Sequence, residues 1–327
     1  MVRKWDFRIL LLRISFLLVV YNEYLVYYIN LWKWEANTGE GARILVVADP
    51  QILGYENENI ITRWDSDRYL RSTFQVASNF FKPDIVVFLG DLTDEGSLSN
   101  DQLFSEYASR FMTLFHVDSS VKTIYLPGDN DIGGEGNDPF LPSKLERFTE
   151  EFGKIKSHIL RTVEFIPVNR IASESSLPEK CKNDSLISCV VLSHIPVNVY
   201  GKEYASHIMI KINPLLTISA HEHSSFVIYP KMDPLHIEDI NDFSVHNFKS
   251  DESVEIVAPT CSYRMGKQIY GFGALVIGDN KIISYNVLWS PSRFVALIVY
   301  GFFVLIVCFV VCLRISSWFI LRTMGLY

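Results

Sequence analysis

Aspartate and histidine residues recur along this chain directly after short hydrophobic runs. In chain order, these polar segments are Asp49-Pro50-Gln51, Gly90-Asp91-Leu92-Thr93-Asp94, Gly128-Asp129-Asn130-Asp131, Ser193-His194 and Ala220-His221-Glu222-His223. Carboxylates and imidazoles suit Mn, Fe and Zn, and soft thiolate ligands do not occur in these segments. Taken alone, a Gly-Asp pair after a strand is typical of a turn, and a His-x-His segment is typical of an exposed position on the surface. The five segments in this order predict a metal site.

Two of the segments also indicate how ligands would be presented. His221 and His223 point to the same side of an extended segment, because side chains alternate along a strand with period two. Asp91 follows a buried run and Gly90, which lets the backbone approach closely, so Asp91 is the best candidate to bridge two metal ions. The predicted ligands are Asp49, Asp91, Asp129, His194, His221 and His223.

Hydrophobic patterning predicts the elements that carry these segments. Strands are expected over 43–48, 85–89, 123–126, 163–168, 189–192, 215–218, 227–229, 255–258, 274–277 and 282–288, and helices over 65–81, 100–115 and 141–152. In open α/β sheets the site lies outside the carboxyl ends of the strands, so five strand ends would meet at one edge. Alternating strands and helices followed by more continuous strands predict an α/β sandwich of mixed sheets. Residues 231–253 are polar and acidic and are expected to form a surface excursion.

Composition narrows the class of protein. The chain has 327 residues, 49% of them hydrophobic, which is enough for one sizeable domain with its own core. The net charge of −7 argues against a general nucleic-acid binder. A phosphorylated substrate is still compatible with this charge, because bound metal ions would offset it locally.

An apolar stretch near each end predicts attachment to a membrane. Residues 294–313 are apolar without interruption and match the length of a bilayer span, although a buried core helix is the alternative. The N-terminal stretch is interrupted by Arg13, Asn22 and Glu23. It can be an uncleaved anchor, a cleaved signal peptide or an interfacial helix. We expect the anchor, because no small-residue cleavage site follows the apolar core.

Basic residues set the expected orientation of these stretches. They precede the first stretch and follow the second, which places both termini in the cytosol, and they are Arg3, Lys4, Arg8, Arg13, Arg314 and Arg322. The expected division is a cytosolic N-terminus with the first membrane segment (1–35), a lumenal domain (36–290), a transmembrane helix (294–313) and a cytosolic tail (314–327). Cys181 and Cys189 flank a polar loop and could pair or stay free, and Asn183 in that loop begins a glycosylation sequon.

The ordered motifs resemble the calcineurin-like metallophosphoesterase superfamily, whose pattern is D-x-H, G-D-x-x-D, G-N-H-D, a lone His and G-H-x-H. The segments VADPQILG, FLGDLTDEG, PGDNDIGGE and HIPV are similar to the metallophosphoesterase 1 group, also called post-GPI-attachment-to-proteins factor 5 and related to the fungal cell division control protein 1. The resemblance implies an αββα sandwich of two mixed sheets flanked by helices, with a transmembrane helix at each end.

The resemblance also implies a function and a ligand set. Members of the group use two divalent metal ions, mostly Mn, to remove an ethanolamine-phosphate branch from the glycan of GPI anchors, which helps GPI-anchored proteins leave the endoplasmic reticulum. Carried over, one metal would be held by Asp49, Gln51, Asp91 and His223, and the other by Asp91, Asp129, His194 and His221. The expected location is the endoplasmic reticulum, its exit sites or the cis-Golgi, with the domain lumenal. Expected partners are GPI-anchored substrates, the membrane and cargo receptors, with no nucleic acid.

Three positions depart from the superfamily pattern. Gln51 replaces a His ligand and would be a weaker, neutral ligand, whereas Asp129 replaces Asn and adds negative charge. Asn130 stands where the family has the His that protonates the leaving oxygen, and an amide cannot supply that proton. Asp131 or His116 could take the role of the acid. The alternative to a phosphodiesterase is therefore a catalytically impaired metal-binding protein that recognises GPI-linked cargo without cleaving it.

Overall fold

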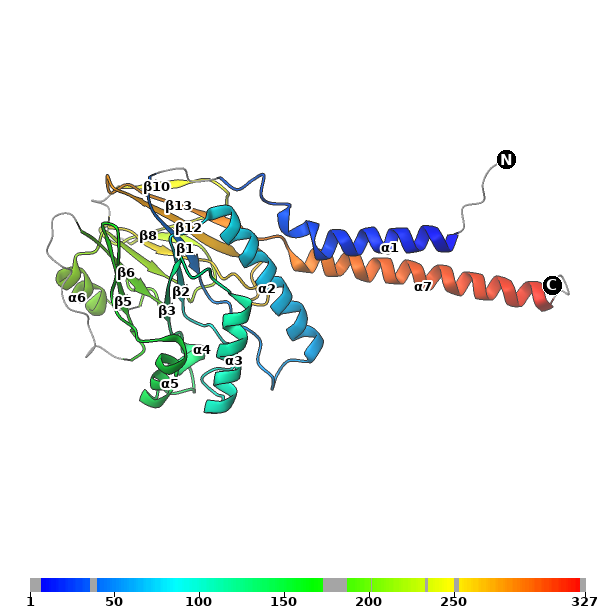
Figure 1. Cartoon of the computed structure of the whole chain (residues 1–327), viewed down its shortest axis with the longest axis horizontal. Coiled ribbons are helices and arrows are strands. Elements are labelled where there is room, and N and C mark those ends of the chain that lie inside the picture. Colours follow the sequence, from blue (N-terminus) through cyan, green and yellow to red (C-terminus); the bar gives the residue numbers. More distant parts are fainter. Residues whose placement is uncertain are drawn as a thin grey trace. The chain divides into compact units, whose positions relative to one another are not determined.

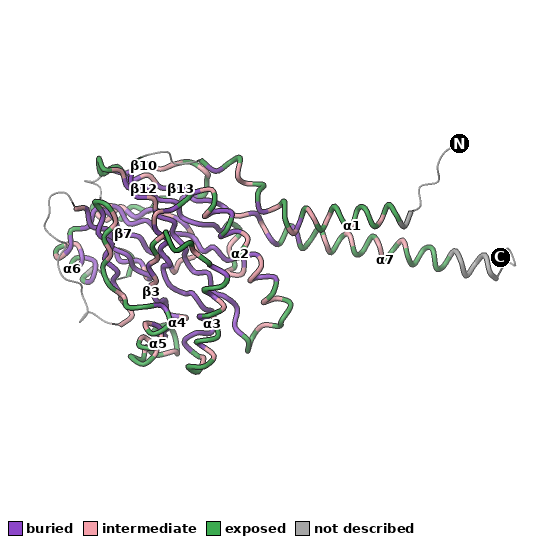
Figure 2. The backbone as a smooth tube through the Cα atoms, viewed as in Figure 1, coloured by how far each residue is buried: buried purple, intermediate pink, exposed green. Residues whose placement is uncertain are grey.

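Runs of aliphatic and β-branched residues form the strands of two mixed sheets in the computed structural model. The structure describes residues 7–35, 40–172, 187–200, 202–232, 235–249 and 253–323. By its contacts the chain divides into two units, residues 30–290 and residues 1–29 with 291–327. The sheets belong to the first of these units, and their central strands, such as β2 (Ile85–Leu89) and β6 (Ser188–Ser193), are buried (Figure 2).

The first sheet supplies three parallel strands with aligned ends. These are β1 (Gly41–Val47), β2 (Ile85–Leu89) and β3 (Lys122–Leu126). Val47 pairs with Phe88, and Leu89 pairs with Leu126, so the three carboxyl ends open onto one edge. The antiparallel strands β12 (Gly271–Gly278), β13 (Ile283–Trp289) and β10 (His246–Phe248) complete the order β10-β13-β12-β1-β2-β3.

The second sheet has a parallel centre with antiparallel edges. Its order is β4-β5-β6-β7-β11-β8-β9. The parallel strands are β5 (Val163–Val168), β6 (Ser188–Ser193), β7 (Leu216–Ser219) and β11 (Glu255–Val257). The antiparallel strands are β4 (His158–Leu160), β8 (Phe226–Tyr229) and β9 (His236–Asp239).

The two sheets pack face to face, with helices on their outer faces. Ile44 and Val87 of the first sheet share one buried cluster with Val190 and Ile218 of the second. The helices α2 (Ile60–Phe81) and α3 (Asp101–Leu114) cover the outer face of the first sheet, where the ring of Phe88 meets Phe74 and Phe111. The helix α6 (Lys202–Ile212) covers the second sheet (Figure 1). The predicted α/β fold of two mixed sheets flanked by helices is confirmed.

Several predicted boundaries and elements need correction. The helix expected over 65–81 begins at Ile60, because the side chain of Asn59 accepts hydrogen bonds from the backbone N–H groups of Ile61 and Thr62 and caps that end. Residues 231–253 are not only a surface excursion, since β9 and β10 form edge strands of the two sheets there. The short elements β4, α6 and α4 (Asp129–Ile132) were not predicted. The helix α5 (Pro142–Phe152) begins one residue later than expected.

The second unit consists of α1 (Phe7–Glu23), a short 3₁₀ turn (Leu25–Tyr28) and α7 (Arg293–Thr323). Within it, residues 293–316 of α7 are long and apolar enough to cross a membrane, with a mean hydropathy of 3.1. No other helix among the described residues meets that criterion, so the expected N-terminal span is not shown. The two helices contact each other through polar groups of Asn22, Glu23, Arg293 and Tyr300.

Candidate metal centre

The predicted ligands all lie just past the ends of parallel strands. Asp49 and Asp91 follow β1 and β2, and Asp129 begins the short helix α4 after β3. His194 and His221 follow β6 and β7 of the second sheet. Because both sheets end their parallel strands on the same side, side chains from five separate segments meet in one place.

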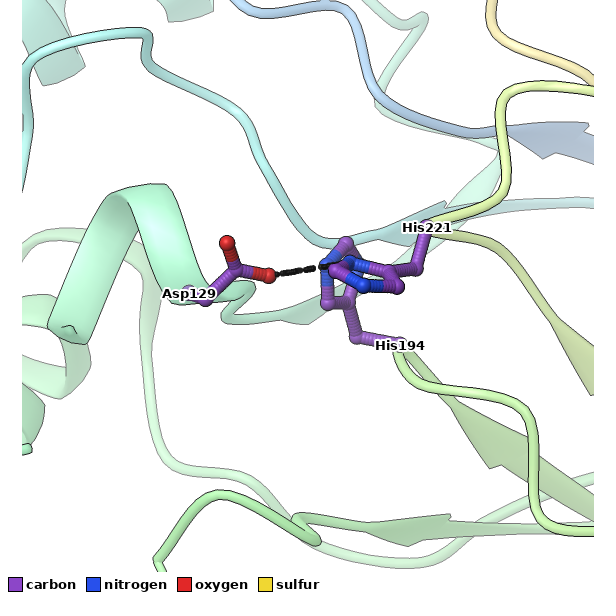
Figure 3. A group of neighbouring side chains, drawn as sticks. All are labelled: Asp129, His194 and His221. Atoms are coloured by element: carbon purple, nitrogen blue, oxygen red, sulfur yellow. Dashed lines mark hydrogen bonds and ion pairs between the residues drawn. The ribbon is translucent and has the colours of Figure 1, made fainter. Parts of the chain in front are cut away.

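Asp129, His194 and His221 form the tightest group (Figure 3). The Oδ1 atom of Asp129 lies 2.9 Å from Nε2 of His194 and 3.1 Å from Nδ1 of His221. The two imidazole nitrogens are 3.3 Å apart. The other ring nitrogen of His194, Nδ1, lies 2.7 Å from the carbonyl oxygen of Leu89, so this backbone contact fixes the ring with Nε2 facing the group.

Asp91 lies at the centre of the predicted ligand set. Its Oδ1 is 3.4 Å from Nε2 of His194 and accepts a hydrogen bond of 3.0 Å from the backbone N–H of Asn130. Its Oδ2 accepts from the side-chain amides of Gln51, at 2.8 Å, and Asn130, at 3.0 Å. This position is compatible with the bridging role predicted for Asp91, which stays a prediction.

Asp49, Asp91 and His194 form a second group that adjoins the first. The Oδ1 atom of Asp49 lies 3.8 Å from Nδ1 of His194. His223 belongs to neither close group, but its Nε2 lies 3.4 Å from Nε2 of Gln51, which in turn contacts Asp91. All the predicted ligands are therefore gathered in one region, with His194 shared between the two groups.

The backbone at these positions adopts the left-handed region that non-glycine residues rarely occupy. Five predicted ligands have positive φ, and they are Asp49 (46°), Gln51 (39°), Asp91 (50°), His221 (70°) and His223 (58°). Such conformations cost about 1–3 kcal/mol each and persist where the surrounding structure imposes them, as it does at functional sites. Because five such residues lie at this one site, we infer that the requirements of the site, and not those of stability, determine the backbone conformation of these turns.

The buried carboxylates of the centre favour the binding of cations. Asp49 is fully buried, and its Oδ2 has no hydrogen-bond partner among the described residues. Burial raises the pKa of Asp49 despite the nearby histidines, and burial together with the charges of Asp129 and Asp49 raises the pKa of Asp91 well above its usual range. An unpaired buried carboxylate oxygen beside two more aspartates is costly unless a cation binds. The residues present therefore fit divalent metal ions.

The histidines respond to the same charges. Burial alone would lower the pKa of His194, but Asp91, Asp129 and Asp49 together raise it to about 10. A hydrogen bond with Asp129 raises the pKa of His221, although burial opposes it. Burial lowers the pKa of His223 against the attraction of Asp49, so this ring is neutral at physiological pH and has a lone pair available for a metal ion.

The two candidates for a replacement acid lie in different surroundings. Asp131 is fully buried, and its carboxylate accepts hydrogen bonds from the backbone N–H groups of Leu92, Thr93 and Gly128. It therefore braces the turns that carry Asp91 and Asp129. His116 is exposed after the end of α3.

Sequence reasoning missed two residues beside the ligands. Glu135 hydrogen-bonds to Asp129, which raises the pKa of Glu135. The hydroxyl of Thr260 donates to the backbone carbonyl of Asp49 at 2.8 Å and holds the turn after β1. The run Gly133-Gly134-Glu135-Gly136 directly after the third motif is a signal that could have identified Glu135, whereas Thr260 lies far from its partner in sequence.

The chain is similar to a known protein family and to several curated proteins. The calcineurin-like phosphoesterase model matches residues 42–225. The metallophosphoesterase 1 homolog of Drosophila melanogaster is 30% identical over 133 residues, covering 40% of this chain and 36% of that protein. The Caenorhabditis elegans homolog is 28% identical over 193 residues, covering 57% of this chain and 52% of that protein. This chain thus spans about half the length of such curated relatives, or less.

Solved structures align over most of the chain at low identity. The purple acid phosphatase PPD1 of yellow lupin aligns with a TM-score of 0.49 and 12% identity, covering 78% of this chain and 53% of that structure. The family model covers more than half of the chain, including the five motif segments through His223. The chain belongs to the calcineurin-like phosphoesterase family.

Proposed function

We propose that this chain is a metal-dependent phosphodiesterase with two divalent ions. The observation that carries the proposal is the pair of adjoining ligand groups, Asp49-Asp91-His194 and Asp129-His194-His221, with Asp91 at their centre. One ion would be held by Asp49, Gln51, Asp91 and His223, and the other by Asp91, Asp129, His194 and His221. Bound divalent ions would supply Lewis acidity toward a phosphoryl oxygen.

The chain's own groups would then place the substrate and limit proton transfer. The amide of Asn130 lies beside Asp91 and can donate a hydrogen bond to a phosphoryl oxygen, but it has no titrating proton for the leaving group. The loss of a general acid is typically worth about 10²–10⁴-fold in rate. We therefore expect slow turnover.

For the substrate, we propose the ethanolamine-phosphate branch of GPI anchors. The motif segments resemble the metallophosphoesterase 1 group, and the curated relatives bear that name. The apolar helix α7 is consistent with an anchor in the membrane where GPI lipids lie. We propose Mn as the metal and the lumen of the endoplasmic reticulum or cis-Golgi as the location, where GPI-anchored cargo and its receptors would be the partners.

The test uses the full chain purified in detergent and loaded with Mn. We expect release of ethanolamine phosphate from a GPI glycan, and a loss of that release after Asp91→Ala. An exposed aspartate on an edge strand, changed in Asp239→Ala, is the matched control and should retain the native rate. An intact GPI glycan under conditions where a His-containing relative cleaves it would rule out the proposed reaction.

One observation favours a second function. The position of the family's acid is filled by Asn130, whose amide is held on Asp91. In this alternative the chain binds metal and recognises GPI-linked cargo without cleaving it. The two functions differ in one measurement, since a turnover that Asp91→Ala abolishes excludes the non-catalytic alternative.

We also propose that α1 is retained as an anchor beside α7. Arg293 lies 3.4 Å from Glu23, and the hydroxyl of Tyr300 donates to Glu23 at 2.7 Å. The side chain of Asn22 donates to the carbonyl of Ala296 at 3.2 Å. Polar groups of this kind pair across membrane helices, where an isolated charge is costly. The same pairing would keep both termini on the cytosolic side and residues 36–290 in the lumen.

The sequence leaves open whether Cys181 and Cys189 pair, and the structure describes only one of the two. Cys189 is disulfide-bonded, whereas Cys181 and the sequon at Asn183 lie outside the described residues. A disulfide would agree with the lumenal location proposed above, because such bonds persist in oxidising compartments.

A further inference from the structure

Glu255 is a buried carboxylate that is bonded to two of the segments carrying predicted ligands. It is the first residue of β11 and is fully buried. In the second sheet it is paired in register with Thr217 of β7, the strand that precedes His221. A charged residue in such a position is costly unless hydrogen bonds compensate it.

Four donors surround the Glu255 carboxylate. Its Oε1 accepts from the backbone N–H of Val197 and from the hydroxyl of Ser219, both at 2.7 Å. Its Oε2 accepts from the backbone N–H of Asn198 at 2.8 Å and from the side-chain amide of the same residue at 2.9 Å. An ionised carboxylate is an acceptor with about four lone-pair sites, so these donors satisfy it.

The donors belong to the segments that carry two histidines of the tightest ligand group. Val197 and Asn198 follow His194 by three and four residues, and Ser219 precedes His221 by two. The two segments are also joined directly, since the backbone N–H of Ala220 donates to the carbonyl of His194 at 2.9 Å. Glu255 therefore ties together the supports of two rings that come from different strands.

Arg170 holds the first of these segments from another direction. Its guanidinium donates to the carbonyl of Pro196 at 2.9 Å, and its charge interacts with that of Glu255. The turn after His194 is thus held at three consecutive residues, Pro196, Val197 and Asn198. This turn follows His194, whose Nε2 lies 2.9 Å from Oδ1 of Asp129.

We propose that Glu255 is a positioning residue for the subsite formed by Asp129, His194 and His221. It would fix the two imidazoles at the spacing that a shared ion needs, without touching the ion itself. The inference rests on the metal centre proposed above. Outer partners of metal ligands typically contribute about 10–100-fold in metal affinity. We expect the affinity for one of the two ions to fall by that factor when the hydrogen bonds of Glu255 are removed.

The test measures metal binding by the full chain purified in detergent and stripped with a chelator. Mn is titrated by equilibrium dialysis, with the bound metal counted by mass spectrometry, in the native protein, Glu255→Gln and Ser219→Ala. Ser219→Ala removes one hydroxyl donor and keeps the fold's volume nearly constant, so it covers the case in which Glu255→Gln fails to fold. Ser66→Ala, a fully buried serine on α2, is the matched control.

We expect the substitutions to weaken the binding of one ion and not of the other. One ion should bind about 10–100-fold more weakly in Ser219→Ala and Glu255→Gln, the other should bind as in the native protein, and excess Mn should restore turnover. Native affinity for both ions with only a lower melting temperature would overturn the inference, because Glu255 would then be a general support. A native chain that binds no Mn would overturn the metal centre itself, and the two failures are therefore distinguishable.

Discussion

The side-chain amide of Asn130 donates to Oδ2 of Asp91 at 3.0 Å, and the backbone N–H of the same residue donates to Oδ1 at 3.0 Å. Asn130 is therefore held against the carboxylate proposed to bridge the ions. It lies where a proton donor would be needed, but it offers only an amide. This relationship allows two proposed properties of the site to be tested separately, namely metal binding through Asp91 and proton supply at position 130.

Restoring an imidazole at this position should raise the rate. For Asn130→His we expect at least a tenfold higher kcat on a phosphodiester, because a general acid contributes about 10²–10⁴-fold. The measurement is steady-state hydrolysis at matched Mn content. Asn137→His, at an exposed position in the following loop, is the control and should leave the rate unchanged. An unchanged kcat for Asn130→His with full metal would show that proton donation does not limit the reaction.

Metal loading should release protons. In the metal-free protein the pKa of His194 is raised to about 10, chiefly by Asp91 and Asp129 acting against burial, and the pKa of His221 is raised by Asp129. The His194 ring is therefore protonated at pH 7.5, and an ion must displace its proton to bind. Calorimetry of Mn binding in buffers of different ionisation enthalpy should show the release, and affinity should fall as pH is lowered. Binding without proton release would contradict these shifts.

Asp94 should destabilise the fold when it is ionised. Burial and the charges of Glu95 and Glu58 raise the pKa of Asp94 from 3.8 to about 6. Since the folded pKa exceeds the unfolded one, stability falls as pH rises from about 4 to 6 and the loss persists above. Asp94→Asn should therefore stabilise the metal-free chain at pH 7.5 by roughly 1 kcal/mol after allowance for solvent screening, with no gain at pH 3. Thermal melts at both pH values measure the difference. Asp239→Asn, an exposed carboxylate, is the control, and an equal gain at both pH values would count against the proposed cause.

The contact between α1 and α7 can be tested by cross-linking. Asn22→Cys with Ala296→Cys, in a chain with Cys308 and Cys312 changed to serine, should form a disulfide under mild oxidation, because the side chain of Asn22 reaches the backbone of Ala296. Asn22→Cys with Phe309→Cys is the control, and it should not cross-link, because Phe309 is exposed and thirteen residues further along the helix. Mass spectrometry of the mature chain should also detect residues 1–29, and a chain that starts after this segment would show that it is cleaved.

The sequence predicted most strands and named side chains that lie close together, but it did not reveal the residues that support them. The strand β2 matched closely, because a buried strand reads as a continuous apolar run, and β5 also matched although it contains Glu164. The first five residues of α2 were missed, since the capping role of Asn59 is a local backbone effect outside the hydrophobic pattern. The candidate ligands could be named from the sequence because their types and order repeat a family pattern, and their role as ligands stays a prediction.

The supports were missed because their partners are distant in sequence. Glu255 is bonded to residues 36 and 58 positions away, and Asp131 holds turns on another strand. The hydrophobic periodicity of the sequence does not identify such residues. They come close to the metal centre only when the two sheets pack together. The separation of His223 from the two close groups likewise depends on how two turns meet, which sequence spacing does not define.

We propose that the centre binds two divalent ions and that phosphodiester hydrolysis needs both of them. The most direct measurement is metal content and turnover on the same purified sample, for the native chain and for Asp91→Asn. We predict about two equivalents of Mn and a measurable rate for the native chain, with both lost in Asp91→Asn because the shared ligand is changed. A native chain that holds no metal, or an Asp91→Asn variant that keeps the native rate, would contradict the account.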